Sequence, residues 1–194
     1  ADHMISHQPG LIPQVTGTLT HERYWGAVTM VDHSSNFSYS HMIKGTSNAE
    51  TVAAKDAYER VLGAYGHKVK AYHGNNLRFD SEMFKDSCNK AKQRYTYCGV
   101  GAHHQNGIAE RKIKDLTLGG RTLLLHAKRM LPEYITTILW PFAIKCYEDR
   151  MNNLIHRADG RTPYETLAGL EATPVNVKDF HTFGCPCYVL DHRH

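Results

Sequence analysis

Two polar segments, whose key positions Asn75 and Glu110 are 35 residues apart, have the composition of a metal-dependent site. Glu110 follows an Asn-Gly pair and lies in the first turn of a predicted long helix, where the helix dipole favours a carboxylate. Asn75 lies in the loop after the predicted strand that ends at Tyr72. Acidic side chains at a helix start and at a strand end can converge on hard cations such as Mg²⁺. Two such ions would stabilise the attacking and leaving oxygens of a phosphodiester displacement.

The residues around both positions resemble the integrases of copia-type LTR retrotransposons, a branch of the retroviral-type integrases. Residues 98–111, which include Glu110, are similar at nearly every position to the family segment that carries the catalytic glutamate. Residues 72–79 resemble the segment that carries the second catalytic aspartate, and the 35-residue spacing is the usual one in that family. The match departs at two positions: Asn75 stands in place of that aspartate, and Leu77 in place of a glycine.

Residues 1–14 are similar to the family segment that carries the first catalytic aspartate. The resemblance therefore implies that Asp2 is the first metal-binding residue. In that case the chain begins inside the first strand of the sheet, and we expect that strand to be truncated. Two alternatives stay open: residues 1–4 could be a cloning remnant, and Asp32 could be the first acid. For Asp32 we favour the role of a turn aspartate that accepts hydrogen bonds from nearby backbone N–H groups.

The resemblance implies an integrase catalytic core, which integrates element cDNA by metal-dependent phosphodiester cleavage and strand transfer. Asp2, Asn75 and Glu110 would be both the catalytic residues and the ligands of two Mg²⁺ or Mn²⁺ ions. An amide supplies one neutral carbonyl oxygen and cannot bridge two cations as a carboxylate does. We therefore expect the second ion to bind weakly and catalysis to be impaired. The alternative is a catalytically inactive integrase-like fragment that retains only nucleic-acid binding.

The charge of the chain is compatible with a polyanionic partner. Its 23 lysines and arginines outnumber its 19 aspartates and glutamates, and the cations cluster after residue 110. The resemblance implies that the partners are element cDNA ends and target DNA, that the protein forms homo-oligomers, and that a working integrase acts in the nucleus. The residues expected to bind nucleic acid are His103, Gln105, Asn106, Arg111, Lys112 and Lys114.

Composition restricts the class of protein further. No apolar run approaches the roughly 20 residues of a membrane span, and no signal peptide pattern is present, so we expect no membrane association. Five cysteines, an odd number with uneven spacing, indicate reduced thiols in an intracellular protein. Cys185 and Cys187 are one residue short of the usual Cys-x-x-Cys chelate and lack two further ligands, so we disfavour a structural zinc site.

The pattern of apolar and turn residues predicts an α/β domain. The expected elements are a hairpin over 24–31 and 36–43, a helix over 46–66, a strand over 68–72, a helix over 81–92, a strand over 94–98 and a long helix over 106–130. With a strand before it, this order is that of a ribonuclease-H-like fold, in which helices flank a mixed sheet. We assign residues 1–170 to the catalytic core with its C-terminal helices, and 171–194 to a linker and the start of a small β-rich segment.

Helical spacing of apolar residues predicts which side chains the helices bury. The expected core positions are Val52, Ala53, Ala57, Val61, Leu62, Tyr65, Met83, Phe84, Cys88, Ile108, Ile113, Leu116, Leu123, Leu124 and Ala127. Gly119 and Gly120 should bend or break the long helix, because each glycine costs about 1 kcal/mol relative to alanine. After that helix, Pro132 should start the next one, and Pro141 should kink it.

Overall fold

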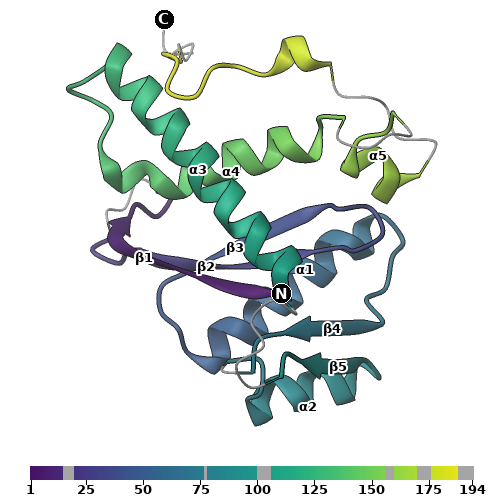
Figure 1. The fold of residues 1–194 in the computed structure, drawn as a ribbon. Coiled ribbons are helices and arrows are strands. Elements are labelled where there is room, and N and C mark those ends of the chain that lie inside the picture. Colours follow the sequence, from purple (N-terminus) through teal and green to yellow (C-terminus); the bar gives the residue numbers. More distant parts are fainter. Residues whose placement is uncertain (15–19, 77, 100–105, 156–159, 170–175, 188–194) are drawn as a thin grey trace, which may run out of the picture.

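The computed structural model of the protein describes residues 1–14, 20–76, 78–99, 106–155, 160–169 and 176–187. The strands are β1 (Asp2–Gly10), β2 (Tyr24–Val31), β3 (Ser38–Ile43), β4 (Ala71–Gly74) and β5 (Arg94–Tyr97). The α-helices are α1 (Asn48–Ala64), α2 (Glu82–Lys90), α3 (Gly107–Met130), α4 (Trp140–Asn152) and α5 (Pro163–Ala168), and Thr137–Leu139 and Val177–Asp179 form short 3₁₀ helices. Figure 1 shows their arrangement. No helix within the described ranges is long and apolar enough to cross a membrane.

The strands form two hydrogen-bonded groups that meet at the start of β1. β1, β2 and β3 make an antiparallel sheet in that order, with Asp2 opposite Thr29. β4 and β5 pair in parallel. The backbone nitrogen of Ala1 donates a hydrogen bond to the carbonyl of His73 in β4 at 2.6 Å, which places β4 beside the start of β1 (Figure 1). The five strands therefore follow the mixed order β3-β2-β1-β4-β5.

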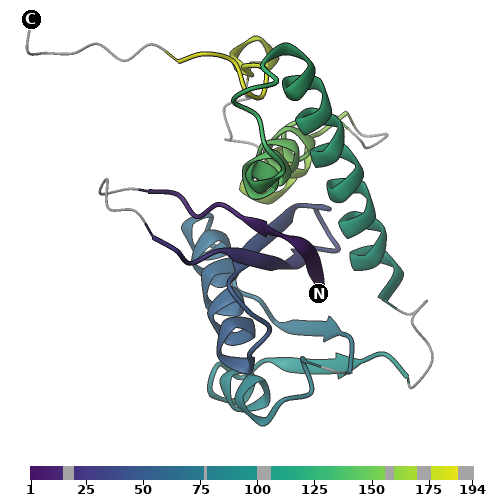
Figure 2. The same ribbon diagram turned by 90° about the vertical axis from the view of Figure 1, so that its left-hand side faces the viewer.

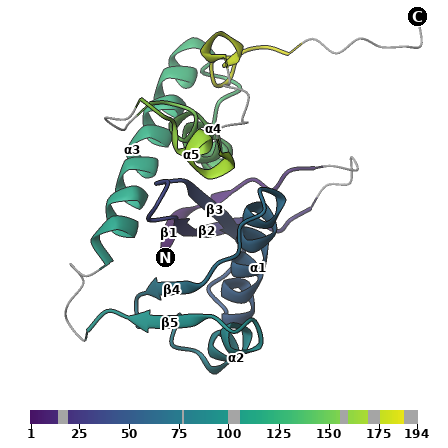
Figure 3. The same cartoon turned by 90° about the vertical axis from the view of Figure 1, so that its right-hand side faces the viewer.

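Helices cover both faces of this sheet (Figure 2). α1 and α2 pack against one face, in a cluster of buried side chains that includes Val28, Leu62 and Phe84. α3 and α4 pack against the other face, in a cluster that includes Met4 and Leu116. Figure 3, from the opposite side, shows α1 and α3 on opposite sides of the strands. The sheet and its two helical layers confirm the predicted α/β architecture.

The predicted helices are present, but three positions at the margins of their buried faces differ from the prediction. Three residues predicted to be buried are exposed: Ala53, Met83 and Ile108. In each helix the next residue along the chain is buried: Ala54, Phe84 and Ala109. A helix turns by about 100° per residue, so a shift of one position moves a side chain from the core to the surface. The strand predicted over 68–72 also lies further along the chain, as β4.

The Gly119–Gly120 pair neither bends nor breaks α3, which is one continuous helix. A Cβ atom at Gly119 would lie 2.2 Å from Tyr147 Cζ, and one at Gly120 would lie 2.9 Å from Ile144 Cγ1. Both partners belong to α4, so the glycines allow the two helices to approach closely. The prediction of a break was wrong because packing between helices compensates for the poor helix propensity of glycine.

α4 begins at Trp140, later than predicted. Pro141 lies in its first turn, where the missing N–H has no helical partner, so it starts α4 instead of kinking it. Pro132 lies in a turn that follows Leu131, the C-terminal cap of α3. The assignments of the two prolines were therefore wrong: Pro141 takes the role predicted for Pro132.

Polar side chains of α4 cover the outer edge of the sheet, where β3 is the outermost strand in the order given above. Asn152 accepts a hydrogen bond from the Ser38 backbone N–H at 3.0 Å, and its amide donates to the Ser38 carbonyl at 2.8 Å. Lys145 Nζ donates to the Ser40 carbonyl at 3.1 Å. The buried carboxylate of Glu148 accepts from the Ser40 hydroxyl at 2.8 Å. These contacts fix α4 to β3.

The last described residues return to α3 and α4. A capping box formed by Thr162 and Glu165 starts α5. Further on, Arg150 donates to the His181 carbonyl at 2.6 Å. Gly184 lies so close to α3 that an added Cβ would be 2.9 Å from Ala127 Cβ. Residues 180–187 form no strand, and 188–190, which the sequence assigned to the same β-rich segment, lie outside the described residues.

Candidate active site

Asp2 and Asn75 lie in direct contact, although 73 residues separate them. Asp2 is the first residue of β1 and Asn75 follows the last residue of β4, so the adjacency of these strands brings the two side chains together. The Asn75 amide donates a hydrogen bond to Asp2 Oδ1 at 2.5 Å. The same oxygen accepts the backbone N–H of His3 at 2.8 Å. Both side chains are half-buried.

The N-terminus of α3 is attached at the same point. Asn106, the residue before α3, is 4% exposed, and its side-chain amide donates to the Ala1 carbonyl at 3.1 Å. Glu110 follows Asn106 by about one helical turn, so the two residues project from the same side of the helix. Figures 1 and 2 show the start of α3 next to the N-terminus. The sequence analysis assigned Asn106 to nucleic-acid binding, whereas its contact with Ala1 positions the helix that carries Glu110.

The pKa of the Cys98 thiol depends on the charges of both Asp2 and Glu110. Burial raises the pKa of the Cys98 thiol, and the negative charges of Asp2 and Glu110 raise it further. Cys98 Sγ lies 3.6 Å from Nε2 of His73, the residue whose carbonyl pairs with β1. The thiol therefore stays protonated near pH 7, and its environment is made of the same strands and helix that carry Asp2 and Glu110.

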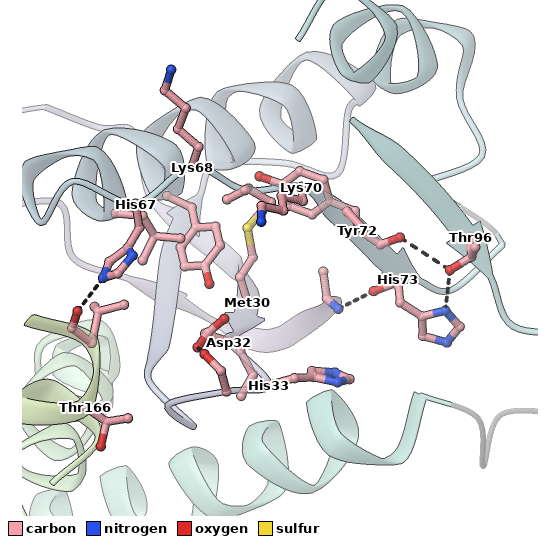
Figure 4. Close-up of a pocket in the computed structure, with 18 residues that line it drawn as sticks. Met30, Asp32, His33, His67, Lys68, Lys70, Tyr72, His73, Thr96 and Thr166 are labelled. Atoms are coloured by element: carbon pink, nitrogen blue, oxygen red, sulfur yellow. Dashed lines mark hydrogen bonds between the residues drawn. The ribbon is translucent and has the colours of Figure 1, made fainter. Parts of the chain in front are cut away.

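Asp32, the alternative first acid, has the turn role. Its Oδ2 accepts hydrogen bonds from the Ser35 N–H at 2.8 Å, from the Ser35 hydroxyl at 2.7 Å and from the Ser34 hydroxyl. Burial alone would raise the pKa of Asp32, but these hydrogen bonds hold it below its usual value. Figure 4 shows Asp32 lining a cavity of about 500 Å³ with His67 and Lys70. The Asp32 carboxylate thus stabilises the turn that connects β2 and β3.

A histidine that the sequence analysis did not single out lies next to Asp2. The His3 ring packs at a tilt of 53° against Phe79, with ring centroids 5.0 Å apart, and its Nε2 lies 3.1 Å from Thr51 Oγ1. Burial, together with the positive charges of Arg78 and the N-terminus, lowers the pKa of His3 to about 4. The imidazole is therefore neutral near pH 7. Alternation along β1, which turns successive side chains to opposite faces, was the signal that could have placed it under α1.

The donor groups present do not fit a two-ion centre. Asn75 and the His3 backbone both direct N–H donors at Asp2 Oδ1, so this oxygen has no lone pair left for a shared ion. Two carboxylates, Asp2 and Glu110, remain of the predicted triad. Within the part of the chain that the structure describes, no group of three or more His, Cys, Asp or Glu side chains could hold a metal ion.

The predicted nucleic-acid contacts differ in their exposure. Arg111 and Lys114 are exposed on α3, and Arg121 is exposed two turns further along. Lys112 is half-buried, and burial lowers its pKa. It is therefore less available to a DNA phosphate than its exposed neighbours. Three positions singled out from the sequence lie outside the described residues: Leu77, His103 and Gln105.

Comparisons with known proteins identify the fold. No protein-family model and no curated protein sequence matches the chain. A chain of the simian T-cell lymphotropic virus intasome in complex with PP2A regulatory subunit B56 gamma has a TM-score of 0.63 at 16% identity, over 90% of this chain and 56% of that one. The HTLV-2 integrase catalytic core domain in complex with magnesium has 0.55 at 17%, over 85% and 94%. The BIV integrase catalytic core domain has 0.53 at 16%, over 72% and 83%.

The chain therefore has the ribonuclease-H-like fold of retroviral integrase catalytic cores, as the sequence predicted. It spans 56% of the intasome chain that it matches and nearly all of the isolated HTLV-2 core. At these identities the likeness establishes the fold, and the function is argued from the site.

Proposed function

We propose that this chain is the catalytic core of a retroviral-type integrase of the copia-type branch, which binds DNA and whose strand-transfer activity is impaired. The contact between Asp2 and Asn75, beside the helix that supplies Glu110, carries the proposal. The motif resemblance concerns the same three residues. Sequence and geometry thus support one site by independent routes.

The residues of this site would act on a phosphodiester. Asp2 and Glu110 supply negative charge, and in an intact three-carboxylate site they would bind Mg²⁺ or Mn²⁺, the ions that polarise the attacking water or DNA 3′ hydroxyl. The HTLV-2 core was solved with magnesium. Asn75 supplies a neutral amide in place of the third carboxylate, so charge that develops at phosphorus is stabilised less. We therefore expect strand transfer to be slow or absent because of Asn75 alone.

α3 carries the residues proposed to bind DNA. Four of its exposed cations follow one another at spacings of three and seven residues, which places them along one face of the helix. They are Arg111, Lys114, Arg121 and Lys128. The proposed ligands are element cDNA ends and target DNA. The same proposal includes action in the nucleus. It also assigns residues 1–170 to the catalytic core and residues 171–194 to a following segment.

Homo-oligomerisation also belongs to the proposal. The HTLV-2 core was solved in dimeric and trimeric forms, and the simian viral protein was solved as an intasome.

Fluorescence anisotropy with a labelled DNA duplex tests the binding proposal. We expect binding without strong sequence preference that weakens steeply as salt rises, because phosphate contacts release counterions. Reversing three charges with Arg111→Glu, Lys114→Glu and Arg121→Glu should weaken binding at low salt by at least about tenfold and flatten the salt dependence.

Three exposed cations away from α3 provide a matched control. The variant Arg60→Glu, Lys90→Glu and Lys178→Glu makes the same change in net charge. It should lose much less affinity than the α3 variant. Affinity that does not respond to salt, or an equal loss in both variants, would exclude α3 as the DNA-binding surface.

The second candidate function is an inactive integrase-like fragment that retains only nucleic-acid binding. The Asn75 amide favours it, because the amide occupies an Asp2 oxygen that an ion would need. The two candidates differ in one observable property: whether a carboxylate at position 75 restores strand transfer.

A further inference from the structure

The Asp2–Asn75 hydrogen bond joins the two groups of strands. β1 pairs with β2 and β4 pairs with β5, and the backbone contact of Ala1 with His73 links β1 to β4. The Asn75 amide adds a second link, 2.5 Å long, from the exit of β4 to Asp2 Oδ1. Asn106 adds a third, because its amide donates to the Ala1 carbonyl and holds the start of α3. Three hydrogen bonds thus fix Ala1 and Asp2 at the start of β1: Ala1 donates one, and it and Asp2 accept the other two.

The Asn75 amide and the His3 backbone N–H both donate to Asp2 Oδ1 and satisfy this oxygen without a cation. A half-buried carboxylate needs hydrogen bonds or a counter-charge to offset its lost hydration. The hydrogen bond from Asn75 to the ionised carboxylate is charge-assisted and therefore stronger than one between neutral groups. A carboxylate at position 75 would instead face Asp2 at close range as a like charge. That pair would need a proton or a cation between its oxygens.

We infer that the Asn75 amide takes the structural place of a divalent ion, so that this core assembles its site without metal. Because Asp2, Asn75 and Glu110 are treated as a former ion site, this role depends on the proposed function. It has two consequences. The stability of the native chain is independent of Mg²⁺ and Mn²⁺, and the single change Asn75→Asp makes it metal-dependent.

Thermal unfolding of the whole 194-residue chain in EDTA and in MnCl₂ tests this role. The Tm of the native chain should differ by less than about 1 °C between the two solutions. Asn75→Asp should unfold at least about 3 °C lower than the native chain in EDTA, and Mn²⁺ should restore the difference. Asn75→Ala loses the hydrogen bond and gains no charge, so its Tm should fall equally in both solutions.

Asn89→Asp is the matched control, because it adds the same charge at an exposed position of α2. It should behave like the native chain in both solutions. Electron paramagnetic resonance of Mn²⁺ gives a second readout: the native chain should bind no ion tightly, and Asn75→Asp at least one. If Asn75→Asp folds in neither solution, the Asn75→Ala result and the Mn²⁺ titration of the native chain decide.

Mn²⁺ stabilisation of the native chain as large as that of Asn75→Asp would overturn the role of Asn75, as would an unchanged Tm in Asn75→Ala. Either result, with salt-sensitive DNA binding intact, leaves the proposed function standing. If the stability of the native chain is independent of metal but the chain does not bind DNA, the role of Asn75 is supported and the proposed nucleic-acid function is wrong.

Discussion

His3 should make the stability of this protein depend on pH through a single side chain. Burial and the charge of Arg78 lower its pKa in the folded state from 6.5 to about 4. Protons therefore bind the unfolded chain preferentially, and the contribution of neutral His3 is complete above the unfolded pKa and lost as pH falls toward 4. We expect the free energy of unfolding, measured with urea, to drop by about 2 kcal/mol between roughly pH 7 and pH 5.

The variant His3→Gln isolates this effect. Glutamine keeps a polar group near Thr51 and does not titrate, so the pH dependence over this range should flatten. His21→Gln, at an exposed position, should keep the native profile. If His3→Gln remains as sensitive to pH as the native chain, the Ala1 ammonium or His41 is responsible, because burial lowers both of their pKa values.

Single residues could be predicted where a sequence motif identifies them. The resemblance of residues 1–14 and 72–79 to family segments singled out Asp2 and Asn75, which the fold brings into contact. Lys55 shows the limit, because a lysine is expected at the surface. It is 2% exposed, with Nζ 2.9 Å from Glu59 Oε1, and that oxygen also accepts the Tyr72 hydroxyl at 2.7 Å. Its burial depends on a partner network that includes β4, which no local pattern reveals.

Among the elements, the close packing of α3 on α4 depends on Gly120. Alanine is normally the better helix former by about 1 kcal/mol. Here an added Cβ would lie 2.9 Å from Ile144 Cγ1 and 3.2 Å from the Ile144 backbone nitrogen. The backbone atom cannot rotate away, so the helices must separate. We expect Gly120→Ala to lower the free energy of unfolding by about 1–3 kcal/mol in urea denaturation.

Gly63 provides the comparison, because it also lies in a helix, near the end of α1. No atom beyond its own helix lies within 4 Å of a Cβ added there. Gly63→Ala should therefore stabilise the protein, by up to about 1 kcal/mol. The two substitutions should have opposite signs. The same sign in both would mean that helix propensity, and not the contact with α4, controls position 120.

Elements were predictable where the chain carries its own start and stop signals. The hairpin β2–β3 and the start of α3 lie within two residues of their predicted positions. The helix after α3 was misplaced, because Pro132 and Pro141 are both acceptable first-turn prolines. Trp140 decides between them by donating its indole N–H to the Gln8 carbonyl at 3.0 Å. That contact joins residues 132 positions apart and is absent from any local pattern.

The proposed strand transfer would depend on the whole molecule, because β1, the exit of β4 and the start of α3 must come together for it. We expect little or no strand transfer from the native chain. Asn75→Asp restores the third carboxylate, so Mn²⁺-supported joining of a labelled oligonucleotide to target DNA should appear in that variant. Adding Glu110→Gln to it should abolish the activity again.

Other outcomes of this assay have definite meanings. Equal activity in the native chain and in Asn75→Asp would show that residue 75 is not at the reacting centre. Inactivity of both, with DNA binding intact, would favour the inactive integrase-like fragment.

For the molecule as a whole, the sequence predicted the fold and the proximity of Asp2 and Asn75, but not the hydrogen bond between them. A spacing of 35 residues identifies Asn75 and Glu110 without fixing the distance between them. The direction of the Asn75 amide follows from β4 lying beside β1, a contact between distant parts of the chain. The positioning role of Asn106 depends on the same contact.

The polar cover of α4 over β3 has a consequence for aggregation. The outermost strand of a sheet presents backbone groups that can template the addition of strands from other molecules. At Ser38 both groups are occupied by Asn152, and at Ser40 the carbonyl is occupied by Lys145. A second chain could extend the sheet here only after displacing α4. The outer edge of β3 is thus protected from amyloid-like growth at these positions.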